Sequence, residues 1–306
     1  MSGKEVEVEA DICCANCGVA EVDIKLKDCD GCDLVKYCSD KCKEVHKEKH
    51  EEECKKRQKE LHDKKLFRHP DGSHLGECPL CFLPLPLEKS KSIFFSCCCN
   101  TICQGCRYAH QIKNGSQTCP FCREPAPRGE EEIKKRLMKR IKANDPAAMS
   151  HMGEMRSNEG DHDAAAIKYW TKAAELGNQE AHFQLAVSYH LGKGVENDEE
   201  KAVYHLEKAA IGGHHVARYN LGYEEWNNGN IERAVKHFII AANLGDEESM
   251  KELWRHYSKG NITKEDLDAT LRTHHAAIDE RKSPEREAAE AFRNERERVQ
   301  MMWHGG

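Results

Sequence analysis

Residues 14–54 read CANCGVAEVDIKLKDCDGCDLVKYCSDKCKEVHKEKHEEEC. Cysteine pairs separated by two or three residues recur through this stretch, and His50 forms the last pair with Cys54. These eight donor groups suffice for two tetrahedral zinc sites, because structural zinc takes four thiolate or imidazole ligands. About forty residues bury too little apolar surface to fold alone, so metal binding is expected to supply the missing stability.

This series of ligands resembles the MYND zinc finger over the whole stretch, including the aromatic Tyr37 just before the fifth ligand. The resemblance implies two structural zinc ions whose ligand pairs interleave along the chain. It assigns one ion to Cys14, Cys17, Cys38 and Cys42, and the other to Cys29, Cys32, His50 and Cys54.

The part of the stretch from Ser39 to Cys54 is expected to be helical, and its spacing places His46 and His50 on one face. His46 therefore competes with His50 as a ligand. We favour His50 because it stands where the family's ligand does and gives the H-x-x-x-C spacing of structural sites. MYND fingers typically bind short proline-containing peptides, often with an aromatic residue three positions before the ligand histidine. Lys47 occupies that position here, which departs from the peptide-binding pattern.

All 17 cysteines of the 306-residue chain lie between Cys13 and Cys122. A secreted disulfide framework is the rival interpretation, but residues 1–11, MSGKEVEVEAD, are acidic and lack the apolar core of a signal peptide. Regularly paired cysteines in a reducing compartment are more often thiolate ligands than disulfides. No apolar run approaches the roughly 20 residues of a membrane helix. We therefore expect a cytoplasmic or nuclear protein that does not enter a membrane.

A second cysteine cluster begins with CPLC at 78–81, continues with the triplet at 97–99, and ends with CPFC at 119–122. Its order and spacing resemble an all-cysteine variant of the RING domain, because Asn100 stands where a RING carries a ligand histidine. The sequence does not settle which two thiols of the triplet would bind; we take Cys97 and Cys98, with Cys99 as the spare. The resemblance then implies one zinc ion on Cys78, Cys81, Cys103 and Cys106, and another on Cys97, Cys98, Cys119 and Cys122, which makes four Zn²⁺ ions in the chain.

RING domains act as ubiquitin ligases by holding a charged ubiquitin-conjugating enzyme in a reactive pose, without a nucleophile of their own. By this resemblance, Leu80 and Pro120 match the apolar positions that meet the conjugating enzyme, and Arg123 matches the cation that bridges enzyme and ubiquitin. Arginine suits such a bridge because its planar fork serves two acceptors at once. The alternative interpretation is that Leu80 and Pro120 only shape the zinc knuckles and that Arg123 is merely exposed.

The second half of the chain has an internal period. Three segments align, YWTKAAELGN at 169–178, HLEKAAIGGH at 205–214 and HFIIAANLGD at 237–246, and three tyrosines recur every 34 residues: Tyr189, Tyr223 and Tyr257. The combination of LGxGV, an acidic turn and KAA-x-x-G resembles Sel-one-like repeats, which are antiparallel helix pairs related to tetratricopeptide repeats. Such pairs stack into a solenoid whose concave face commonly binds proteins.

Within the repeats, residue types predict packing roles. Small residues are expected to let helices approach closely (Ala174, Ala210, Ala242), and glycines are expected to form the turns between units (Gly177, Gly213, Gly245). The repeated tyrosines are expected in the core, together with Trp170, Trp226 and Trp254. The pairs His214–His215 and His274–His275 have no neighbouring ligand pattern in the sequence, so we expect them on the surface.

The expected fold class is therefore a set of small zinc-stabilised α+β modules at the N-terminus followed by an all-α repeat solenoid. The expected domains are a MYND-type finger at 14–54, a helical linker at 55–77, a RING-type finger at 78–122, a linker and helix at 123–142, Sel-one-like repeats at 143–282, and a charged C-terminal helix or tail at 283–306. The formal net charge of −6 gives no whole-protein attraction to nucleic acid.

Two functions fit this organisation. The first is a zinc-binding protein–protein interaction adaptor, in which the fingers and repeats each hold a partner. The alternative is a RING-type ubiquitin ligase whose repeats recruit the substrate and whose finger binds a ubiquitin-conjugating enzyme. No residue of the chain is expected to be catalytic in the sense of a nucleophile or a base.

Overall fold

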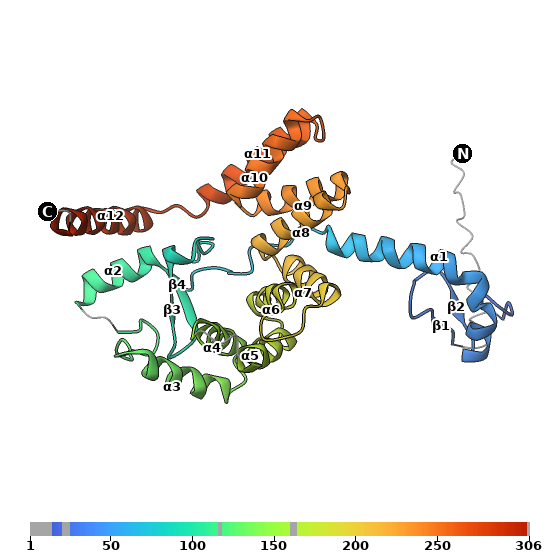
Figure 1. Cartoon of the computed structure of the whole chain (residues 1–306), viewed down its shortest axis with the longest axis horizontal. Coiled ribbons are helices and arrows are strands. Elements are labelled where there is room, and N and C mark those ends of the chain that lie inside the picture. Colours follow the sequence, from blue (N-terminus) through green and yellow to red (C-terminus); the bar gives the residue numbers. More distant parts are fainter. Residues whose placement is uncertain (1–13, 20–24, 116–117, 160–163, 305–306) are drawn as a thin grey trace, which may run out of the picture. The chain divides into compact units, whose positions relative to one another are not determined.

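The computed structural model describes residues 14–19, 25–115, 118–159 and 164–304. The chain divides into two compact units, Met1–Arg68 and His69–Gly306. The second cysteine cluster and the repeats thus belong to one unit, while the first cysteine cluster belongs to the other (Figure 1). Among the helices in the described residues, none combines the length and apolarity of a membrane span.

The first unit consists of a short antiparallel hairpin and one long helix. Strand β1 (Lys27–Asp28) pairs with β2 (Lys36–Tyr37), and α1 (Asp40–Leu66) follows. Helix α1 begins at Ser39 because the side-chain oxygen of this residue accepts a hydrogen bond from the backbone N–H of Cys42. The buried apolar cluster is small, with Leu26 and Tyr37 beside Cys14. So little buried apolar surface cannot stabilise a fold by itself. The first unit therefore needs another source of stability.

The second unit begins with the second cysteine cluster. After η1 (Lys89–Lys91), strand β3 (Ser92–Phe95) pairs antiparallel with β4 (Asn100–Cys103), and α2 (Gln104–Asn114) follows directly. The register pairs Phe95 with Asn100, so the cysteine triplet forms the hairpin turn. Leu85 and Ile102 fill the small core beneath the hairpin.

The rest of the unit is helical (Figure 1). Helix α3 (Glu130–Ile141) precedes four helix pairs, and α12 (Pro284–His304) follows them. The pairs are α4 (Pro146–Asn158) with α5 (Ala164–Glu175), α6 (Gln179–Leu191) with α7 (Glu199–Ile211), α8 (His215–Asn227) with α9 (Ile231–Asn243), and α10 (Glu247–Ser258) with α11 (Lys264–Asp279). The predicted fold class, small modules with short strands followed by a helical solenoid, is confirmed.

The three turns between the four helix pairs use the glycines that the sequence singled out. The φ angles are 83° at Gly177, 86° at Gly213 and 92° at Gly245, a left-handed conformation that favours glycine. The residue after each glycine caps the next helix with its side chain: Asn178, His214 and Asp246. Each boundary between two helix pairs therefore consists of a glycine in the left-handed conformation and a residue that caps the next helix.

The predicted aromatic core is only partly correct. Trp170 is buried and donates its indole N–H to the carbonyl of Ser150. In contrast, Tyr223, Trp254 and Tyr257 are 44%, 48% and 39% exposed. The prediction was wrong for these three because other residues of the same helices, with those of α9, fill the space between the pairs: Ala234, Val235, Phe238, Met250 and Leu253.

Helix α4 approaches α5 so closely that only glycine fits at one position. A Cβ atom on Gly153 would lie 2.5 Å from the Trp170 indole nitrogen. Gly153→Ala should therefore lower the free energy of unfolding by about 1–3 kcal/mol through overpacking, although alanine has the higher helix propensity. Urea denaturation measures this. Asn158→Ala, at the exposed end of the same helix, should change stability by under about 0.5 kcal/mol. Equal effects of the two substitutions would contradict the close contact.

Candidate metal centres

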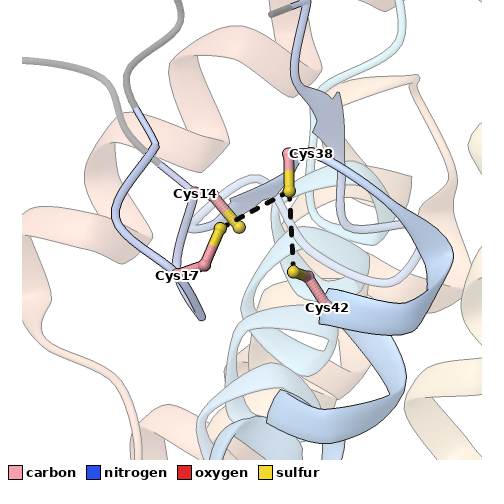
Figure 2. Close-up of side chains that lie close together, drawn as sticks. All are labelled: Cys14, Cys17, Cys38 and Cys42. Atoms are coloured by element: carbon pink, nitrogen blue, oxygen red, sulfur yellow. Dashed lines mark hydrogen bonds between the residues drawn. The ribbon is translucent and has the colours of Figure 1, made fainter.

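Four cysteine side chains from separate segments meet in the first unit (Figure 2). We call Cys14, Cys17, Cys38 and Cys42 the first ligand group; their sulfur atoms all lie within 4.8 Å of one another. The Sγ atom of Cys38 is 3.5 Å from that of Cys17 and 3.5 Å from that of Cys42. A disulfide bond would hold two sulfurs about 2.05 Å apart. A tetrahedron with four Zn–S bonds of about 2.3 Å has edges of about 3.8 Å, so the group fits a zinc ion.

A second ligand group lies against helix α1 and contains Cys29, Cys32, His50 and Cys54. The Sγ atoms of Cys29 and Cys54 are 3.8 Å apart, and the Nε2 atom of His50 is 3.1 Å from Cys32 Sγ. His46, the competing histidine, stacks on His50 and its Nδ1 atom lies 3.1 Å from the hydroxyl of Tyr37. The structure thus brings His50 and not His46 to the sulfurs.

The second unit holds a third and a fourth ligand group. The third contains Cys78, Cys81, Cys103 and Cys106, and the fourth contains Cys97, Cys98, Cys119 and Cys122. Distances between Sγ atoms are 3.9 Å for Cys81 and Cys103, 3.6 Å for Cys98 and Cys119, and 3.3 Å for Cys97 and Cys122. In both units the first and third ligand pairs along the chain meet, and so do the second and fourth.

Cys99 lies apart from the fourth ligand group. It packs with Leu137 and interacts with Arg140 and Asp145, and burial raises the pKa of its thiol to about 12. Asn100, at the position where a RING has a ligand histidine, donates a hydrogen bond from its side-chain amide to Cys98 Sγ over 3.4 Å. Asn100 thus hydrogen-bonds a sulfur of the fourth ligand group without belonging to that group. Such hydrogen bonds orient the ligands in metal sites.

The thiols within a group differ in their ease of ionisation. Burial raises the pKa of Cys14, but several backbone N–H groups, that of Cys17 first among them, outweigh burial and lower the pKa to about 6. The pKa of Cys78 is lowered in the same way to about 7. Hydrogen bonding to neighbouring thiols raises the pKa of Cys38 to about 12, and burial does so for Cys54. Because a metal needs all ligands deprotonated, binding releases protons, and affinity should rise with pH.

The residues predicted to meet a conjugating enzyme lie beside the third and fourth groups. Leu80 and Arg123 are exposed, and Pro120 is half-buried. Two neighbours that the sequence analysis did not single out, Phe82 and Phe121, are also exposed. The geometry leaves this apolar surface accessible, and its role stays a prediction.

A fifth cluster, which the sequence analysis missed, joins the segment before the third group to the repeats. His74, Glu180 and His214 meet there, and Glu180 Oε2 is 3.7 Å from His74 Nε2 and 3.4 Å from His214 Nε2. His214 is only 3% exposed and His274 is also buried, so the expectation that both lie on the surface was wrong. One feature of the sequence could have indicated that His214 is not a surface residue. In the aligned segments its position is occupied by the helix-capping residues Asn178 and Asp246.

The geometry of the fifth cluster does not fit a tetrahedral zinc ion. The His74 and His214 rings stack with centroids 4.1 Å apart at 17°, whereas two imidazoles on one zinc place their centroids about 5 Å apart. His214 Nδ1 accepts the N–H of Ala217, so its Nε2 carries the proton and points it at Glu180. Lys89 adds a cation 3.0 Å from Glu180 Oε1. We conclude that this is a hydrogen-bonded cluster that fastens residues 73–89 to α6 and α8.

Burial raises the pKa of Glu180, but the hydrogen bond from His214, the adjacent His74 ring and the charge of Lys89 outweigh it and hold the pKa well below its usual range. Glu180→Gln should therefore remove a charged acceptor and lower the free energy of unfolding of the full chain by about 2 kcal/mol. Urea denaturation at pH 7 measures this. The control is Glu175→Gln at an exposed position, which should be neutral. A neutral Glu180→Gln would contradict the fastening role.

The zinc assignment predicts how many ions each variant retains in native mass spectrometry. The parent should carry four Zn²⁺ ions, and His50→Ala and Cys97→Ala should each lose one because a tetrahedral site loses a ligand. The matched controls His46→Ala and Cys99→Ala should retain four, since neither side chain belongs to a ligand group. Two or fewer ions in the parent, or a loss caused by either control, would contradict the assignment.

Comparison with known proteins supports two parts of this organisation. Residues 14–54 match the family model of the MYND finger. Residues 146–178, 179–214 and 215–246 match the Sel1 repeat, so each match covers one helix pair from α4 to α9. The cysteine cluster at 78–122 lies outside the matched ranges.

Among individual proteins, a stretch of 89 residues is 34% identical to chitin synthase regulatory factor 4 of Schizosaccharomyces pombe and spans 29% of this chain but only 14% of that protein. A Sel1 repeat protein from Oxalobacter formigenes is 26% identical, with a TM-score of 0.42 over 51% of this chain and 67% of its own. A protective antigen of uropathogenic Escherichia coli that displays an SLR fold is 22% identical, with a TM-score of 0.40 over 60% of this chain and 39% of its own. The family models show that this chain contains a MYND finger and three Sel1 repeats.

Proposed function

We propose that this chain is a zinc-dependent adaptor, in which four structural zinc ions hold two fingers and the helical repeats bind a partner protein. The MYND finger and the Sel1 repeats support this proposal because both are protein-interaction modules built around structural elements rather than reactive groups. Each ligand group supplies four donors, which leaves no coordination position for a substrate.

The observation that carries the partner-binding role is the exposure of aromatic side chains on the repeats. Tyr223 lies in the second half of α8, and Tyr257 lies near the end of α10, 34 residues later. Trp254 is one turn before Tyr257, and the two rings meet edge to face with centroids 6.3 Å apart. Exposed tyrosine and tryptophan side chains are costly to leave in water and are enriched where proteins bind each other. Exposed aromatic side chains on neighbouring helix pairs would let one extended partner meet both helices.

The ligase alternative has a narrower basis. In its favour, Leu80 and Arg123 are exposed beside ligand groups whose pairs interleave as the RING resemblance implies. The comparisons give it no support, since neither family match includes residues 78–122. We therefore place the adaptor first and treat ubiquitin transfer as an outcome to be tested.

The aromatic surface is tested by comparing partners of the full chain with those of variants. Cross-linking and mass spectrometry in lysate of the source cells should yield proteins that bind the parent. The triple variant Tyr223→Ala, Trp254→Ala, Tyr257→Ala should lose them, because hot-spot residues contribute about 2 kcal/mol or more each, roughly thirtyfold in Kd. Tyr204→Ala, an equally exposed tyrosine on α7, is the control and should retain them. Identical partner sets for both variants would contradict the assignment of the surface.

Ubiquitin transfer is tested separately by reconstitution with a panel of conjugating enzymes. The adaptor proposal predicts no transfer by the parent. Transfer that Arg123→Ala abolishes, with zinc content unchanged, would replace the adaptor by the ligase alternative.

A further inference from the structure

One side chain from the C-terminal helix reaches the third ligand group. Arg286, in the first turn of α12, lies 205 residues after Cys81, and its Nη2 atom is 3.5 Å from Cys81 Sγ. The same guanidinium donates to the carbonyl of Pro84 over 2.9 Å and to that of Leu83 over 3.4 Å. The Cys103 sulfur also lies beside this guanidinium. A single arginine therefore contacts two sulfurs of the group and the loop that follows its first pair.

The backbones of α2 and α12 touch at this point. A Cβ atom on Gly105 would lie 2.7 Å from the backbone nitrogen of Arg286, so only glycine fits. Further along the two helices, the Tyr108 and Phe292 rings are 5.1 Å apart. Cys103 caps α2 and Cys106 lies in its first turn, so α12 is docked on the helix that begins at the second ligand pair of the third group.

A second arginine secures the start of α12 to the end of the repeats. Arg281 donates from Nε to the carbonyl of Leu85 and from Nη2 to that of Leu244. Arg286 donates in turn to the carbonyl of Arg281 over 2.7 Å. One network of guanidinium hydrogen bonds thus joins the loop after Cys81, the end of α9 and the start of α12.

The charge of the third ligand group depends on the metal. Four thiolates around one Zn²⁺ leave a net charge of −2, and hydrogen bonds and cations around the ligands stabilise such a site. Without the ion, the two ligand pairs of this group are no longer joined at a common centre. The loop at 83–84 and the start of α2, which Arg286 and the backbone of α12 contact, then lose the centre that holds them together.

We propose that Arg286 is a metal-dependent latch, which holds α12 on the finger when the third ligand group contains zinc and releases it when the metal is lost. This inference rests on the proposed zinc binding of that group. When zinc is lost, α12 and the face of α2 that it covers would both become exposed. It also makes Arg286 a positioning residue for the metal ligands Cys81 and Cys103.

Hydrogen–deuterium exchange of the full zinc-loaded chain tests the latch. In the parent, residues 284–304 should be protected. Cys81→Ala, which removes a ligand of the third group, should raise their exchange at least tenfold. Cys97→Ala, which disrupts only the fourth group, is the matched variant and should leave them protected. Equal exchange in the two variants, whether both protected or both released, would overturn the proposal.

Zinc release to a chromogenic chelator tests the reciprocal effect. Arg286→Gln should release one of the four ions about 10–100 times more readily, the usual cost of losing an outer partner of a ligand, and the other three as the parent does. Arg293→Gln, which removes another arginine of α12 that pairs with Glu290, should behave as the parent. Unchanged release from Arg286→Gln would overturn the latch and leave the zinc assignment intact. If the parent and Cys81→Ala hold the same number of ions, the zinc assignment of the third group fails as well.

Discussion

The interleaving of ligand pairs is the constraint on which both fingers depend. In each finger the first pair shares a group with the third, and the second with the fourth, so neither half can fold without the other. The apolar core of the first unit is too small to replace this constraint, with Leu26 and Tyr37 as its main buried apolar side chains. Zinc binding would then supply folding free energy to these segments, and this contribution would rise with pH because the thiols must lose their protons to bind.

The second finger differs from the first in being built into a larger unit. The cluster of His74, Glu180 and His214 fastens the segment before it, and Arg281 and Arg286 hold the loop after its first ligand pair. Stacking of Phe94 on His151 adds a contact with α4. The repeats are therefore in contact with the segment that carries the third and fourth ligand groups at both ends of the array. Under the proposed function, the partner surface would lie on a scaffold whose integrity depends on zinc.

Periodicity along the sequence predicted the helix pairs and the glycine turns, because both depend on local geometry. The ligand groups that the structure brings together were predicted from the resemblance to two zinc-finger families, in which the order of the ligands is fixed. Their zinc occupancy stays a prediction. The exposure of Tyr223, Trp254 and Tyr257 could not be predicted, since a 34-residue recurrence fixes neither the position within each helix nor the face on which that position lies. His214 and Arg286 were missed for another reason: their partners are 34 and 205 residues distant, beyond any local pattern.

The central claim, that sulfur-rich tetrahedral zinc sites hold both fingers, is tested most directly by zinc K-edge X-ray absorption on the purified full chain. The four ligand groups contain fifteen cysteines and one histidine. The account predicts close to four sulfurs per zinc at about 2.3 Å, with a minor nitrogen shell at about 2.0 Å. A shell dominated by oxygen and nitrogen would contradict it.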